Sequence, residues 1–245
     1  MLWTRKVLVF LLFLSPTAGA EAPLNASSWL ALVDQANSPF EDAELRVTVR
    51  VQKGSTEVER QLHIWQRGDN ERRVEMRSPA RLAGVSLLVT ADGALYSYLP
   101  AYRRVRKVVG EQRGDAFMGT DFSLEDLSRL GFSEDFQAQI EREDTESLTL
   151  RLSALTPSEH RYPDLRLVVD RTTRLPQTIE HLDTEGQVRR RVSLSDVRSV
   201  EGHPFAHSIQ LEDLERNREC TATVESITVN QSLTDRLFQV NQLGR

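Results

Sequence analysis

A period-two alternation of apolar and polar residues constrains the fold of this chain more than any other feature. In residues 45–51, LRVTVRV, every odd position is apolar and every even position is polar. Such a segment forms a β-strand with one buried face and one solvated face. Similar short segments recur as far as residue 229, separated by turn signals such as Asp92-Gly93. The pattern predicts a mostly β fold, a meandering antiparallel sandwich or barrel of roughly eleven strands.

Three segments depart from this alternation and favour short helices. Within residues 21–40, Trp29, Leu32, Val33 and Ala36 lie at helical spacing, Asn25, Ser27 or Ser28 is the expected cap, and Pro39 ends the helix. Residues 122–130 begin with a Ser123 cap, carry acids in the first turn and end at Gly131. Residues 234–243 predict a short helical turn that packs Leu237 and Phe238.

The first twenty residues resemble a secretory signal peptide. Arg5 and Lys6 precede the apolar run of residues 7–14, and Ala18-Gly19-Ala20 gives a small-x-small cleavage pattern. A helix of eight residues rises only about 12 Å, far less than a bilayer core of about 30 Å, which argues against a membrane anchor. Glu21 follows the expected cut, where a lipid-anchored product would need a cysteine. We therefore expect export to the periplasm, cleavage after Ala20 and a soluble mature chain.

Charge and cysteine content limit the partners and the chemistry. The formal net charge is −5, and loss of residues 1–20 lowers it to −7, which argues against generic nucleic-acid binding. Cys220 is the only cysteine, so an intrachain disulfide is excluded. No Pro/Gly/Ser-rich linker divides residues 21–245, so we expect a single domain and a monomer.

No constellation of residues predicts catalysis. The chain lacks a nucleophile elbow, a zinc-binding H-E-x-x-H, a P-loop and a dinucleotide-binding glycine motif. Cys220 is expected to be a small packed residue in a strand, and Pro204 prevents His203 and His207 from sharing a helical face as metal ligands. Glu125 and Asp126 are explained as first-turn acids that complement the helix dipole. The sequence therefore predicts no enzymatic activity, no cofactor and no metal.

Two basic clusters allow a structural and a functional interpretation. The denser one comprises Arg103, Arg104, Arg106 and Lys107. It is either an edge strand protected by charge or a docking surface for an anionic lipid headgroup or an acidic partner. The run Arg189-Arg190-Arg191 has the same two interpretations.

The apolar face of the predicted sheet must be covered. About three short helices are too few to cover some eleven strands, so either the sheet closes on a filled core or a curved sheet leaves a partly covered cavity. An apolar cavity would hold a lipid chain, with about 0.8 kcal/mol gained per buried methylene.

Three segments of the chain form recognisable motifs: residues 118–127, MGTDFSLEDL, which are the most specific, and residues 99–107, LPAYRRVRK, and 169–176, VDRTTRLP, which are less so. Together they resemble the LolA-like group of outer-membrane lipoprotein-sorting proteins. The resemblance implies an unclosed β-barrel with helices as a lid over a hydrophobic cavity that shields acyl chains in the periplasm. Proteins of this group often accompany inner-membrane transporters of the resistance-nodulation-division (RND) type, so the resemblance also implies such a transporter as a partner.

Two hypotheses follow for function. In the first, the chain is a periplasmic carrier that accepts an acylated lipoprotein or lipid at the membrane, in transient contact with its surface, and passes it to an outer-membrane receptor or a transporter. Its cavity would be lined by Leu45, Val47, Val49, Leu62, Ile64, Val74 and Met76. Its lid or rim would consist of Phe117, Met118, Gly119, Thr120, Asp121, Phe122, Leu124 and Leu127. In the second, the chain is a non-carrying adaptor that docks on an RND-type transporter through residues 103–107.

Overall fold

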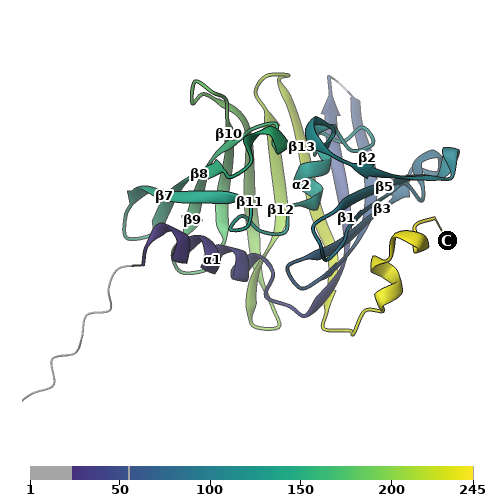
Figure 1. Cartoon of the computed structure of the whole chain (residues 1–245), viewed down its shortest axis with the longest axis horizontal. Helices are drawn as coiled ribbons and strands as arrows, with labels where there is room; N and C mark the ends of the chain where they lie inside the picture. Colours follow the sequence, from purple (N-terminus) through teal and green to yellow (C-terminus); the bar gives the residue numbers. More distant parts are fainter. Residues whose placement is uncertain (1–23, 55, 245) are drawn as a thin grey trace, which may run out of the picture.

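One antiparallel β-sheet forms the whole framework of the molecule (Figure 1). The computed structural model describes residues 24–54 and 56–244; the expected signal segment, residues 1–20, lies outside them. The first six strands are β1 (Asp42–Lys53), β2 (Thr56–Arg67), β3 (Glu71–Ser78), β4 (Ser86–Val89), β5 (Leu95–Leu99) and β6 (Arg104–Val108). The other seven are β7 (Phe136–Glu143), β8 (Ser147–Ala154), β9 (Asp164–Asp170), β10 (Pro176–Leu182), β11 (Val188–Val200), β12 (His203–Asp213) and β13 (Arg218–Val229).

The strand order explains why the sheet stays open. It runs β6-β5-β4-β3-β2-β1-β13-β12-β11-β10-β9-β8-β7, so β1 pairs with β2 on one side and with β13 on the other. β6 and β7 are the two edges and do not pair with each other. The expected unclosed, half-barrel sheet is confirmed, with 13 strands where the alternation predicted about eleven. The two edge strands alternate weakly, since β6 buries only Val108 and β7 buries only Phe136.

Helix α1 (Ala26–Asn37) lies across one end of the sheet, near β7 and β9 in Figure 1. Asn25 caps it as expected, accepting a hydrogen bond from the Ser28 amide at 2.8 Å. Trp29, Leu30 and Val33 are its buried residues, and they pack on the leucines of β8 and β9. The spacing argument had chosen Leu32 and Ala36 and missed Leu30, because the stripe that faces a curved sheet is wider than one helical row.

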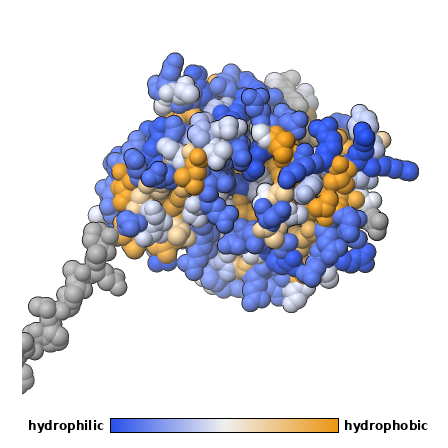
Figure 2. Space-filling model, viewed as in Figure 1, coloured by the Kyte–Doolittle hydropathy of each residue, from blue (hydrophilic) through white to orange (hydrophobic). Residues whose placement is uncertain are grey.

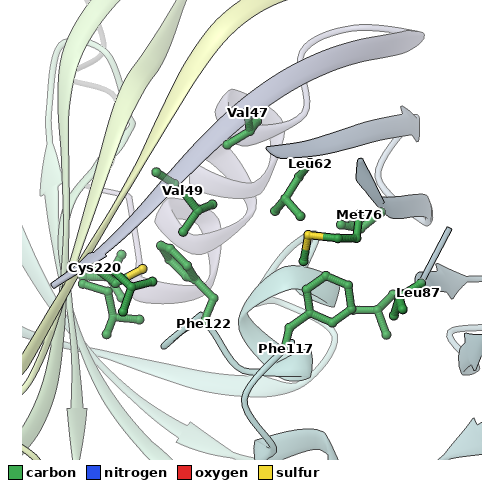
Figure 3. Packing of buried hydrophobic residues seen from close by; sticks show 14 of the residues in the cluster. Val47, Val49, Leu62, Met76, Leu87, Phe117, Phe122 and Cys220 are labelled. Atoms are coloured by element: carbon green, nitrogen blue, oxygen red, sulfur yellow. The ribbon is translucent and has the colours of Figure 1, made fainter. Parts of the chain in front are cut away.

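The sheet's inner face carries the largest apolar cluster. Figure 3 shows Val47 and Val49 of β1, Leu62 of β2 and Met76 of β3 directed toward two phenylalanines from residues 116–130. These are Phe117 and Phe122, which are both buried. Cys220 of β13 is also buried in this cluster, as expected for a packed thiol.

The C-terminal segment covers part of the outer face. Short 3₁₀ turns at Asp235–Phe238 and Val240–Gln242 bring Phe238 and Leu243 onto Trp65 of β2 and Leu88 of β4. The expected helical turn is confirmed, and β4 is consequently buried on both faces. Four further 3₁₀ turns lie in loops: Ala80–Leu82, Pro100–Tyr102, Gly110–Gly114 and Pro157–Glu159. Among residues 24–54 and 56–244, no helix combines the length and apolar character needed to span a bilayer.

The core under α1 provides a test of the fold. Leu150 is 0 % exposed in β8, whereas Leu155, just past the end of that strand, is 62 % exposed. We expect Leu150→Ala to lower the free energy of unfolding by about 2–5 kcal/mol through lost burial and the cavity left behind. Urea denaturation followed by circular dichroism measures this, with Leu155→Ala as the matched control. Equal losses in the two variants would contradict this assignment of the core.

Candidate functional site

A cavity of about 290 Å³ lies between the inner face of the sheet and residues 116–130, which we call the lid segment. Its floor consists of apolar side chains from six strands. They are Ala43, Leu45, Val47, Val49, Leu62, Ile64, Ile179, Val192, Leu194, Phe205, Ala206, Ile209, Ala222 and Val224. Phe122, Leu127 and Leu130 of the lid segment face them, together with Phe132 and Phe40. The space-filling view shows apolar patches on this face of the molecule, separated by hydrophilic residues (Figure 2).

Sequence reasoning located part of this wall. Leu45, Val47, Val49, Leu62 and Ile64, which we expected to line a cavity, all do. Val74 and Met76 lie beside it, packed in the core with Phe117. The contribution of β10 to β13 was missed, although their alternation was visible, because only pairing across β1 and β13 brings those strands to the same cavity.

The lid segment is a compact loop followed by a short helix, α2 (Leu124–Ser128). Its loop is closed by hydrogen bonds from the Phe117 amide to the Phe122 carbonyl and from the Thr120 hydroxyl to the Phe117 carbonyl, both 2.8 Å. Met118 and Gly119 turn the chain with φ of +46° and +82°. A Cβ atom at Gly119 would lie 3.4 Å from the Arg60 side chain, an ordinary contact, so the positive φ is what favours glycine here.

The expected lid residues therefore differ in what they contact. Phe122 and Leu127 line the cavity, and Leu124 and Met118 pack, partly buried, against the adjacent core. Phe117, Thr120 and Asp121 are buried and hold the loop in place. The predicted Ser123 cap is present as a full capping box, since Ser123 Oγ accepts from the Asp126 amide and the Asp126 carboxylate accepts from the Ser123 amide.

Asp126 also connects the lid segment to the sheet. Its carboxylate lies 2.6 Å from Arg190 Nη2 of β11 and 3.7 Å from His181 Nε2 of β10. Burial alone would raise the pKa of Asp126, but the Arg190 guanidinium and its hydrogen bonds lower that pKa to about 2. The same burial lowers the pKa of His181 to about 4, and Asp126 opposes this shift only in part.

Glu125 makes a second polar link. Its Oε1 lies 2.7 Å from His160 Nδ1 and also pairs with Arg129. Burial would raise the pKa of Glu125, and the His160 hydrogen bond and the Arg129 charge lower it overall. The helix dipole alone is thus an incomplete explanation of Glu125 and Asp126, because His160 comes from a distant loop and Arg190 from a distant strand.

Basic side chains from other strands bind the lid segment as well. Arg218 of β13 pairs with the buried Asp121. Arg60 of β2 donates to the Met118 carbonyl at 3.3 Å, and Arg72 of β3 donates to the Leu127 and Arg129 carbonyls at 3.2 and 2.9 Å. Arg60 is a buried charge in β2, and its hydrogen bond to the lid segment explains its position.

The two basic clusters of the sequence differ in their surroundings. Arg103, Arg104, Arg106 and Lys107 are exposed on or beside the edge strand β6, and within the described part of the chain none of them has an ion-pair partner. Tyr102, 72 % exposed, precedes them. In the second run, Arg190 is buried against Asp126, Arg189 pairs with Asp183, and Arg191 pairs with Glu180. Arg190 therefore belongs to the buried network around Asp126, whereas Arg189 and Arg191, whose side chains are 40% and 39% exposed, form ion pairs at the surface.

No cluster of three or more histidine, cysteine or acidic side chains with metal-binding geometry occurs in residues 24–54 and 56–244. His203 and His207 instead contact the rings of Phe40 and Phe205 at the start of β12. Burial raises the pKa of the Cys220 thiol to about 12, which leaves it unreactive at neutral pH.

The polar links give a first prediction for this site. Asp126→Asn removes the negative partner of the buried Arg190 and should lower the free energy of unfolding by about 3–5 kcal/mol. Asp196→Asn is the matched control, because Asp196 pairs with Arg198 on the surface, where such pairs contribute about 0–1 kcal/mol. Urea denaturation of both variants tests this, and a small loss in Asp126→Asn would show that the pair does not hold the lid segment.

A second prediction concerns pH. Between about pH 4 and its ordinary pKa of 6.5, His181 binds a proton in the unfolded chain and not in the folded one. This group therefore has no effect on stability above about pH 6.5 and lowers it progressively as the pH falls toward 4. In His181→Gln the free energy of unfolding should fall less over this range than in the wild type. Parallel pH profiles for the two proteins would count against a buried, neutral His181.

Comparison with known proteins identifies the fold. A family model described as "-like: Uncharacterized protein" matches residues 68–245. No curated protein matches the chain. A DUF1329 family protein from Desulfovibrio piger is similar in structure, with a TM-score of 0.81 and 17% identity over 89% of this chain and 97% of that one.

Two further solved structures are similar. A domain from Vibrio parahaemolyticus, proposed to be an outer membrane lipoprotein-sorting protein, has a TM-score of 0.78 and 17% identity over 90% of this chain and 98% of that one. A LolA superfamily protein from Nitrosomonas europaea has a TM-score of 0.76 and 19% identity over 90% of this chain and 100% of that one. The chain thus has the LolA-like fold that its sequence segments predicted.

Proposed function

This chain belongs to the family of uncharacterized proteins whose model matches residues 68–245, and from its LolA-like fold we propose that it is a periplasmic carrier of acylated lipid or lipoprotein. The acyl chain would lie in the cavity under the lid segment. The similar structures from Vibrio and Nitrosomonas, one named for lipoprotein sorting and one for the LolA superfamily, support this class of function.

The cavity itself is the observation that carries the proposal. Its floor is apolar across six strands, and its volume is about 290 Å³. An apolar ligand that fills it gains about 0.8 kcal/mol per buried methylene. Since a methylene takes roughly the 30 Å³ of a water molecule in the liquid, the cavity matches one chain of about ten carbon atoms.

Release of the ligand would depend on the lid segment. Phe122 and Leu127 would exchange contacts with the sheet for contacts with the acyl chain, and the free-energy difference must be small for the ligand to leave. After release, the ion pairs of Asp126 and Glu125 would bring the lid segment back to the same position over the cavity. On this proposal the protein performs no catalysis and needs no cofactor.

Export fits the same proposal. The signal-like residues 1–20 would direct the chain out of the cytoplasm and be removed after Ala20. The single, buried Cys220 suits an oxidising compartment, because it is shielded from disulfide exchange. The monomeric carrier would then reach cargo at the inner membrane and pass it to an outer-membrane receptor or a transporter.

Chain length provides the direct test. We expect the affinity for alkyl ligands to rise about fourfold per added methylene, and to level off near ten carbons, where the cavity is full. Calorimetric titration of the lipid-free protein with alcohols of six to fourteen carbons measures this. Native mass spectrometry of protein purified gently from the periplasm should also show added mass matching an acylated molecule.

A cavity variant separates this site from adventitious lipid binding. Val47→Glu places a charge on the cavity floor and should abolish uptake, as should Leu62→Glu. Arg46→Glu, its exposed neighbour in β1, should bind like the wild type. Retained uptake by a folded Val47→Glu protein would exclude this cavity as the binding site.

The exposed basic strand favours a second candidate function. Here the chain would be an adaptor that carries nothing and docks on an inner-membrane RND-type transporter through Arg103, Arg104, Arg106 and Lys107. Edge-strand β6 presents these charges without ion-pair partners among the described residues. An acidic surface on the transporter would complement them.

Charge reversal distinguishes the adaptor from the carrier. Arg103→Glu with Arg106→Glu should abolish photo-crosslinking of a probe at Tyr102 to membrane proteins, while alkyl binding stays unchanged. Reversal of two other exposed arginines, Arg46 in β1 and Arg142 in β7, is the control. Crosslinking that survives the first pair of substitutions would argue against docking through β6.

A further inference from the structure

Arg72 is a cation in the cavity wall that has no carboxylate partner. It lies on β3 opposite Gln66 of β2, and both residues line the cavity. Its contacts are with neutral oxygens: Nη1 donates to the Leu127 and Arg129 carbonyls, and Nη2 donates to Gln66 Oε1 at 2.6 Å. No ion pair forms at Arg72 with any residue of the described ranges.

Neighbouring arginines show that this is exceptional. Arg190 pairs with Asp126, Arg129 with Glu125, and Arg73, next in sequence on the opposite face of β3, with Glu75. Arg60 also binds only carbonyl oxygens, but it does not line the cavity. Arg72 is therefore the one cavity-lining arginine of the described chain whose charge is not balanced by a nearby acid.

The donors of Arg72 are not all used. A guanidinium carries five N–H donors, and the contacts above employ three of them. Nε makes no hydrogen bond to the protein, and one N–H of Nη2 also remains. Nε and Nη2 lie along one edge of the planar group, the edge that binds two oxygens of a carboxylate or phosphate side by side.

The site around Arg72 is organised in advance. Gln66, which accepts from Nη2, is itself held by Ser38 Oγ and by the Gly68 carbonyl, each at 2.9 Å from its Nε2. Burial lowers the pKa of Arg72 to about 10, so the side chain still carries its charge at neutral pH. A buried charge is costly unless an opposite charge accompanies it. An anion bound at Arg72 would supply that charge.

We propose that Arg72 binds the anionic head of the ligand, a carboxylate or a phosphate monoester, while a single alkyl tail of about ten carbons lies on the apolar floor. This inference rests on the proposed carrier function and specifies its ligand as a single-chain anionic amphiphile. Asp126, the acid in the same wall, is already paired with Arg190 at 2.6 Å, so its charge is balanced without Arg72.

Three probes of equal chain length test the head separately from the tail. Decanoate, decyl phosphate and decanol are titrated into the lipid-free protein, with inorganic phosphate added in a parallel series. We expect one or both anions to bind at least about tenfold more tightly than decanol, as is typical of a hydrogen-bonded charge. Which anion is preferred identifies the head group, and phosphate alone should not displace either one.

Variants assign the preference to Arg72. Arg72→Met should remove the preference for the anions, measured as the ratio of anion to decanol affinity within the same variant, whereas Arg46→Met, an exposed arginine of β1, should retain that preference. Arg72→Lys, which keeps the charge without the planar edge, should retain a reduced preference. Circular dichroism confirms that each variant is folded.

The outcomes separate this inference from the proposed function. If decanol binds the wild type as tightly as the anions do, the role of Arg72 is wrong and the apolar carrier stands. A preference that persists in Arg72→Met also overturns that role. If none of the three probes binds, both the carrier and the anion site are excluded.

Discussion

The apolar inner face of an open sheet must be covered, and the rest of the structure depends on how this is done. A closed barrel would shield that face by its own curvature. Here β6 and β7 do not pair, so α1, the lid segment and the loop before β1 supply the cover. The leucines of β8 and β9 are sealed by Trp29, Leu30 and Val33. The middle strands are sealed less completely, and the cavity is the space left there.

Ion pairs and hydrogen bonds hold the lid segment in one position on the sheet. Apolar contacts alone would not specify that position. Arginines from four strands bind the lid segment: Arg60, Arg72, Arg190 and Arg218. Each binds a carboxylate or a carbonyl of the loop or of α2. Directional contacts of this kind specify one orientation, whereas leucine and phenylalanine contacts tolerate many. The polar contacts can therefore hold the lid segment in the same position over the sheet, whether the apolar cavity beneath it is filled or empty.

Most of the framework could be predicted from the sequence because its signals are local. Alternation in residues 45–51 located β1, and the Ser123 cap located α2. The ion pairs could not be found in this way. Asp126 and Arg190 lie 64 positions apart, and only the order of β10 to β13 in the sheet brings them together. Arg190 looked like part of a solvated basic run, yet its side chain is 6 % exposed.

The pairing of β1 with β13 has a consequence for how the chain acquires its structure. Synthesis delivers β1 to β6 first, and these strands form one continuous hairpin series; β7 to β13 form another. The two series are joined only along β1 and β13, between residues 43–51 and 220–229. Until the last strand emerges, β1 presents an unpaired edge of high β propensity, which is a template for association with other chains. Truncation before β13 leaves that edge of β1 without its partner and should favour aggregation over a partly folded monomer.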